Sequence, residues 1–200
     1  MAGRLQIVRR FLDFLTLKTS AHYLQSGEAS VSRDQLGASS TQTSQFMRIA
    51  CFVAAKTETI TQVRLSTTGT AAGATPSLVR IGIYEADVDS PSATFTQVAA
   101  TANDTTLLAA TNTRYTKALA ASFTKVAGRR YAVAVLVVTA AAAPTVAGSV
   151  AGVGSGAEFL EWPLVGGSIT GQADLPASFT VASLAAASSS VSRPYVALLP

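Results

Sequence analysis

The pattern of apolar and polar residues begins with an amphipathic segment. Between residues 4 and 18 the apolar side chains recur at spacings of three and four, which aligns them along one side of an α-helix. The residues of this stripe are Leu5, Val8, Phe11, Leu12 and Leu15. A short helix cannot leave so wide a stripe exposed to water. The stripe therefore docks either on its own domain or on another subunit, as an assembly anchor.

Residues 19–44 have a different pattern. They are rich in Ser, Gln and Gly and show no sustained apolar period, a composition typical of a linker. We therefore interpret residues 1–44 as a helix and linker that serve as the assembly anchor, and residues 45–200 as the folded domain with a C-terminal closing segment.

From residue 45 to residue 148 the apolar residues alternate with the period of two of a β-strand. Predicted strands lie near residues 47–54, 63–65, 79–84, 95–100, 115–123 and 131–138, and a further apolar run covers residues 195–199. In the strand 131–138 both alternating sets of side chains are apolar, which predicts a central strand covered on both sides or one at an interface.

Clusters of Gly, Pro, Asn and Asp separate these strands, and no helical period lies between them. This arrangement favours a mainly β fold: an antiparallel β-sandwich of jelly-roll or Greek-key type with a short N-terminal helix. We expect four side chains to face its core: Ile81, Ile83, Val133 and Val135.

Composition narrows the range of partners. Only 13% of the residues are charged, whereas Ala supplies 37 positions and Ser and Thr together 45. The net charge of +4 comes from scattered basic residues, which does not predict a nucleic-acid interface. Residues 131–157 carry no charge, but Pro144 and several glycines interrupt them, so we expect no membrane span.

Candidate chemistry is sparse. The one histidine, His22, lies in the predicted linker, so a catalytic triad is hard to build and we expect no enzyme activity. The one cysteine, Cys51, lies in an apolar run and is interpreted as a small buried hydrophobe. We interpret Asp87 and Asp89 as hairpin-turn residues, with a weak calcium or sugar-hydroxyl role as the alternative. No metal site and no cofactor are expected.

One candidate binding site follows the glycine-rich stretch 152–156. It consists of Phe159, Glu161 and the single tryptophan, Trp162. Aromatic faces stack on sugar rings, and a nearby carboxylate accepts hydrogen bonds from sugar hydroxyls. In the alternative interpretation, Trp162 plugs the end of the sandwich or a seam between subunits.

The folded region resembles a known family. The segments that carry the resemblance are ITQVRL (60–65), TGTAAG (68–73), LVRIGIY (78–84), VAGRRYAVAV (126–135), TGQADLP (170–176) and SRPYVALL (192–199). The first four are similar to the sandwich domains of minor tail proteins of actinobacterial (mycobacteriophage-like) phages, which have a carbohydrate-binding-module-like β-sandwich, and the last two are similar to the ends of the same proteins. The resemblance covers roughly residues 45–200 and rests on strand and turn patterns. It implies an oligomeric virion protein near the tail tip, with host-envelope glycans as candidate contacts, and it supplies no catalytic residues.

Three functional hypotheses follow. The first is a tail-tip or fibre subunit of a phage virion, assembled in the host cytoplasm as a homo-oligomer, with a trimer favoured, together with other tail proteins. The second is a capsid decoration or head-fibre protein, which has the same fold and is attached to the virion in the same way, through its N-terminal helix. The third is a free-standing carbohydrate-binding module, which predicts a monomer with an exposed aromatic platform.

Overall fold

The computed structural model describes residues 28–32, 36–73, 75–150, 163–184 and 192–200. Within these residues the protein is mainly β, and every pair of neighbouring strands is antiparallel. The coarse prediction of an antiparallel β protein is therefore confirmed. The predicted N-terminal helix lies outside the described residues.

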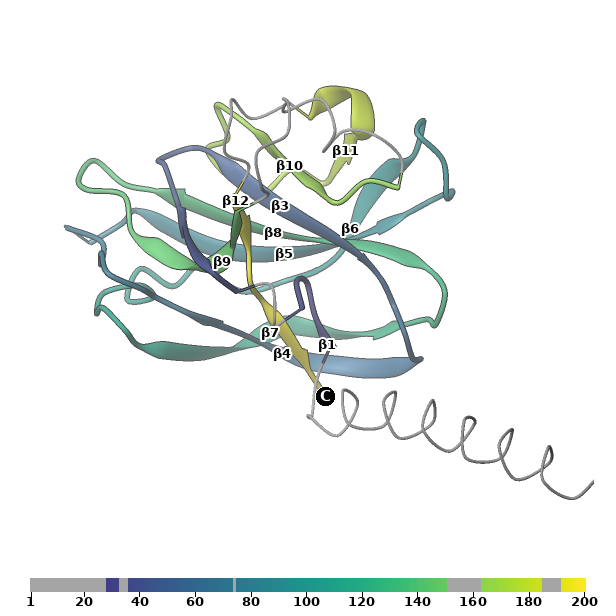
Figure 1. The fold of residues 1–200 in the computed structure, drawn as a ribbon, viewed down its shortest axis with the longest axis horizontal. Coiled ribbons are helices and arrows are strands. Elements are labelled where there is room, and N and C mark those ends of the chain that lie inside the picture. Colours follow the sequence, from purple (N-terminus) through teal and green to yellow (C-terminus); the bar gives the residue numbers. More distant parts are fainter. Residues whose placement is uncertain (1–27, 33–35, 74, 151–162, 185–191) are drawn as a thin grey trace, which may run out of the picture.

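A six-stranded sheet forms one layer of the molecule (Figure 1). Its order is β10 (Gly166–Ile169), β3 (Met47–Val53), β8 (Arg130–Val138), β5 (Leu78–Ala86), β6 (Thr94–Ala100) and β11 (Ser178–Thr180). The two longest runs of register join β8 to its neighbours β3 and β5. The strand with apolar residues on both sides is thus central, as the sequence predicts.

A four-stranded sheet lies below it in the same view, and a three-stranded sheet flanks both (Figure 1). The four-stranded sheet has the order β1 (Glu28–Ala29), β13 (Ala197–Leu199), β4 (Glu58–Ser66) and β7 (Arg114–Lys125). The three-stranded sheet has the order β12 (Ser192–Pro194), β9 (Thr145–Val150) and β2 (Ala38–Thr41).

The linker prediction for residues 19–44 is wrong over part of its length. Strand β1 pairs with β13, and β2 pairs with β9. Ser30 and Val31 are buried beside the C-terminal strand. Short Ser- and Ala-rich strands such as β1 and β2 carry no apolar alternation, so the pattern gave no signal for them. The folded body accordingly includes residues before 45.

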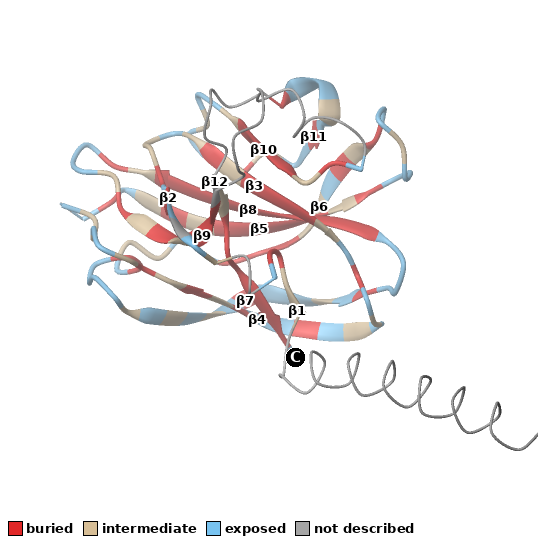
Figure 2. Cartoon of the chain, viewed as in Figure 1, coloured by how far each residue is buried: buried red, intermediate tan, exposed pale blue. Residues whose placement is uncertain are grey.

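The main core fills the space between the six- and four-stranded sheets. Alternate residues of β5 and β8 point into it, including the predicted inward residues Ile81, Ile83, Val133 and Val135, none of which is exposed. From the other side β4 contributes Ile60, Val63 and Leu65. Figure 2 shows β8 in red over nearly all of its length, whereas β3 and β5 include half-buried residues and β7 has exposed stretches.

Strand β7 pairs in the four-stranded sheet and also forms a bridge to the six-stranded sheet. One residue of β4 lies between the pairs Ile60–Phe123 and Gln62–Ala118, whereas β7 has four residues over the same interval. Within this bulge Leu119 forms a bridge to Thr101, at the end of β6. A bulge bends a strand and increases its twist, so β7 turns from the four-stranded sheet toward the six-stranded one.

The principal pairings are nested. Strand β5 pairs with β6, β4 pairs with β7, and β3 pairs with β8. The segment from β3 to β8 therefore resembles a long hairpin that has been rolled so that its arms alternate between two sheets.

Candidate functional site

The residues singled out from the sequence as sites lie outside the described part of the chain. They are the candidate ligand-binding residues Phe159, Glu161 and Trp162 and the anchor residues Leu5, Val8, Phe11, Leu12 and Leu15. Their roles stay predictions. The chemistry that the structure does describe is concentrated in three other clusters.

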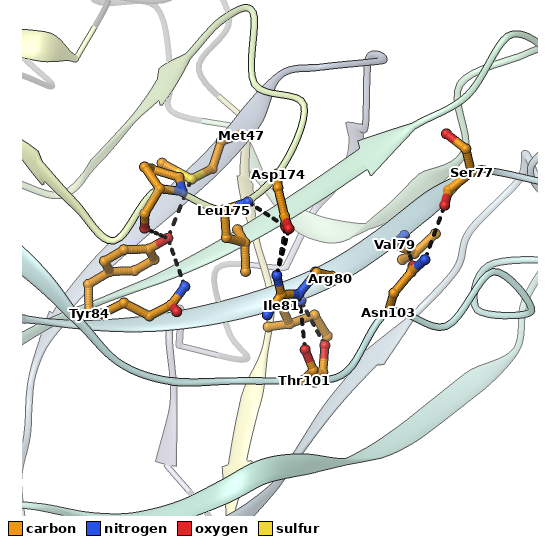
Figure 3. Close-up of polar contacts among 12 residues, drawn as sticks. Met47, Ser77, Val79, Arg80, Ile81, Tyr84, Thr101, Asn103, Asp174 and Leu175 are labelled. Carbon is orange, nitrogen blue, oxygen red and sulfur yellow. Dashed lines mark hydrogen bonds and ion pairs between the residues drawn. The ribbon is translucent and has the colours of Figure 1, made fainter.

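The first cluster lies on the outer face of the six-stranded sheet, where residues 170–177 cross β5 (Figure 3). Arg80 of β5 donates from Nη1 to both carboxylate oxygens of Asp174, at 2.7 and 2.9 Å. Its Nε donates to the carbonyl oxygen of Thr101, at 3.2 Å. Arg80 therefore joins β5, the end of β6 and the crossing segment.

Tyr84, four residues after Arg80 in β5, binds the same segment. Its hydroxyl donates to the carbonyl oxygen of Pro176 at 2.9 Å and accepts from Nε2 of Gln97 at 3.3 Å. Burial raises the pKa of this phenol to about 12. The hydroxyl therefore stays protonated at neutral pH and acts as a structural donor.

Gly82 lies between these two side chains and explains why the segment fits closely. A Cβ at this position would stand 2.9 Å from Cε2 of Tyr84 and 3.0 Å from Cδ1 of Leu175. Because the glycine has no side chain, Leu175 packs directly over β5. Close by, Phe179 stacks on Phe95 with ring centroids 5.0 Å apart.

The second cluster is a buried ion pair where the described chain begins. The side chain of Lys125 is fully buried, and its Nζ lies 2.7 Å from Oε2 of Glu28 and 3.6 Å from Oε2 of Glu58. Nζ also donates to the carbonyl oxygen of Lys56 at 2.8 Å. The other oxygen of Glu28 accepts from the amide of Ala55 at 2.9 Å. Glu28 is thus held by two elements of the body.

The third cluster surrounds the β5–β6 turn. Oδ1 of Asp87 accepts from the amides of Val88 and Thr94, at 2.7 and 2.8 Å. Asp89 accepts from Nε of the buried Arg130 at 2.9 Å. Both aspartates therefore lie in the hairpin connection, and the interpretation of them as turn residues is confirmed.

Cys51 is a free, buried cysteine. Burial raises the pKa of its thiol to about 12, and the charges of Arg130 and Arg193 oppose the rise only in part. The thiol is therefore protonated and shielded in the folded protein. Among the described residues no three His, Cys, Asp or Glu side chains are grouped closely enough to hold a metal ion.

Sequence reasoning missed the first two clusters for different reasons. Arg80 and Asp174 are 94 residues apart, and nothing in an alternating strand reveals such a distant partner. Lys125 ends a polar-looking strand, so its burial depends on Glu28 and Glu58, which come from other elements. One signal was readable: Gly82 lies in the interior of a strand, which is typical of a close approach by another segment.

Comparison with known proteins adds no identity. The chain matches no known family model and no curated protein. In the part of the chain that the structure describes, no helix is long and apolar enough to cross a membrane.

Proposed function

We propose that this chain is a structural subunit of a phage virion, a minor tail protein of the tail tip or fibre. It assembles as a homo-oligomer, a trimer as first choice, through its N-terminal segment, and it contacts other tail proteins. The proposal rests on the resemblance of residues 45–200 to such proteins and on the attachment geometry of the N-terminal segment.

The carrying observation is that the chain enters the folded body at a fixed point. Glu28 is held by Lys125 and by the amide of Ala55. Two residues further on, the Ser30 hydroxyl donates to the carbonyl oxygen of Pro194 at 2.8 Å and accepts from the amide of Val196 at 2.9 Å. Glu28 and Ser30 are therefore fixed beside the C-terminal strand, at the point where the proposed anchor joins the body. An assembly anchor needs such a site to set the direction in which the body projects.

The nested strand pairings support a jelly-roll assignment. A jelly roll arises when a long hairpin rolls up so that its arms distribute over two sheets. The pairs β3–β8, β4–β7 and β5–β6 follow this scheme with one pair fewer than an eight-stranded jelly roll. Such folds serve in virion subunits and in carbohydrate-binding modules, so the assignment is compatible with both and separates neither.

The oligomer is tested by light scattering on the full chain and on a shortened chain that begins at Glu28, which keeps every described strand. We expect a trimer for the first and a monomer for the second. Leu12→Asp, on the predicted apolar stripe, should dissociate the oligomer, whereas Arg10→Asp, on its other side, should not. A full chain that is monomeric would refute the anchor and favour the free-standing carbohydrate-binding module.

The location is tested by mass spectrometry of purified phage heads and tails. Recovery in tails supports the proposal, and recovery in heads supports the capsid decoration or head-fibre alternative. Absence from both would reject a virion role.

Glycan contact is a separate part of the proposal and rests on Phe159, Glu161 and Trp162. Trp162→Ala should leave the melting temperature unchanged while it reduces binding to host-envelope glycans or incorporation into virions. A large loss of stability at unchanged binding per folded molecule would assign Trp162 to the interior instead.

A further inference from the structure

The six-stranded sheet has a second apolar face, and one segment of the chain seals it. We call residues 163–184 the cover segment. The buried residues on this outer face include Met47, Ile49, Cys51, Tyr84, Phe95 and Leu136. The cover segment buries Leu164, Leu175, Phe179 and Leu184 against them. The outer face thus forms a core cluster of its own, separate from the core between the sheets.

The cover segment is attached at its two sides by short strands. Strand β10 pairs with β3 over four residues, and β11 pairs with β6 over three. By contrast, β5 and β8 pair over eight residues and β3 and β8 over six. Local opening requires least free energy where few backbone pairings and few buried contacts must break. The cover segment has fewer backbone pairings to break than the sheet beneath it, and its opening must also break the contacts of Leu164, Leu175, Phe179 and Leu184 with the outer face.

Between its two strands the cover segment is held by specific contacts to β5. They are the bidentate pair of Asp174 with Arg80, the bond from the Tyr84 hydroxyl to Pro176, and the packing of Leu175 over Gly82. Asp174 is more than half exposed, so its ion pair is reached by solvent and breaks without disturbing the core between the sheets.

We propose that the cover segment is a latched lid, which opens as a unit while the sheets stay folded, and that Asp174 with Arg80 is its latch. Opening uncovers the outer apolar face. Cys51 lies in this face, and its amide donates to the carbonyl oxygen of Val165, at 3.0 Å. The opening of the lid therefore exposes the one cysteine of the chain.

Cys51 makes the proposal directly testable on the full chain. The rate at which a maleimide labels the thiol is measured under native conditions at increasing urea. A local opening gives a rate that depends weakly on urea and exceeds the rate of global unfolding. We expect this behaviour for the wild-type protein. Labelling that follows global unfolding at every urea concentration would overturn the proposal.

Three variants test the latch. Asp174→Asn should raise the native labelling rate about two- to fivefold, the range of an exposed ion pair. Gly82→Ala should raise it about tenfold, because its Cβ overlaps Leu175 and Tyr84. Asp104→Asn removes a different ion pair, to Lys117 of β7, and should leave the rate unchanged. Equal rates in Asp174→Asn and the wild type, with Gly82→Ala raised, would reject the latch but not the lid.

Hydrogen exchange distinguishes a lid from a change at Cys51 alone. Peptides from residues 166–184 should exchange faster in Asp174→Asn, whereas peptides from β5 and β8 keep wild-type protection. Faster exchange throughout the domain would mean that the variant lowers global stability, and it would overturn the independent opening.

Discussion

At the scale of single residues, the alternation along β8 decides which substitutions the fold tolerates. Val133 is fully buried between the sheets. Val133→Asp places a carboxylate there without a partner, which should destabilise the protein by about 3–5 kcal/mol. Urea denaturation measures the loss.

The matched control is Thr70→Asp in the β4–β5 connection. Thr70 is exposed, and its backbone rather than its side chain bonds to Thr145. We expect a change within about 0.5 kcal/mol. Similar losses at both positions would contradict the strand register.

Asp104 gives the protein a specific acid sensitivity. Hydrogen bonds from Lys117 and Thr106 lower the pKa of its carboxyl from 3.8 to about 2. The folded state therefore binds this proton less tightly than the unfolded state, so the contribution to stability is present above pH 4 and is lost as the pH falls toward 2. Asp104→Asn should flatten the fall in stability between pH 4 and pH 2, measured by urea denaturation. An unchanged pH profile would show that Asp104 makes no such contribution.

At the scale of elements, one glycine allows the three-stranded sheet to form. A Cβ on Gly148 of β9 would collide with the carbonyl oxygen of Arg193 in β12 and lie 3.1 Å from Cβ of Ser40 in β2. Gly148→Ala should therefore destabilise the protein by about 1–3 kcal/mol through strain on both neighbours. Thermal unfolding measures the effect.

Gly69 provides the comparison, because a Cβ there meets nothing within 4 Å. Gly69→Ala should leave the melting temperature unchanged or raise it slightly. If Gly148→Ala melts like Gly69→Ala, then the packing of β12 and β2 against β9 is looser than described.

The elements also show how far pattern reasoning reaches. The long strands could be predicted from alternation, as in β5, where Val79, Ile81 and Ile83 lie on one side and Arg80, Gly82 and Tyr84 on the other. In β8 the side chains on both sides are apolar, and this predicted its central place in the sheet. The pattern does not reveal the covering layer, since β10 and β11 are short and their sequences GGSI and SFT have no apolar period. The pattern also could not say that the second apolar side of β8 is covered by the chain itself.

At the scale of the whole molecule, the sequence predicted fold class better than site. Fold class depends on local periods, whereas the ion pairs Arg80–Asp174 and Lys125–Glu28 join residues 94 and 97 positions apart. The site residues that composition did single out, Trp162 and its neighbours, lie outside the described residues. The function proposed for the chain therefore depends on resemblance and on attachment geometry more than on recognised chemistry.

The pairing of β1 with β13 sets a condition on the order of folding during synthesis. Glu28 is opposite Leu198, and Ser30 bonds to Val196 across 166 positions. A nascent chain therefore cannot complete its four-stranded sheet until β13 has left the ribosome. Contacts so distant in sequence close late and slow folding, because the intervening chain must first be ordered. Because Glu28 and Ser30 are held beside this same strand, the point at which the N-terminal segment enters the body becomes fixed only after β13 has paired.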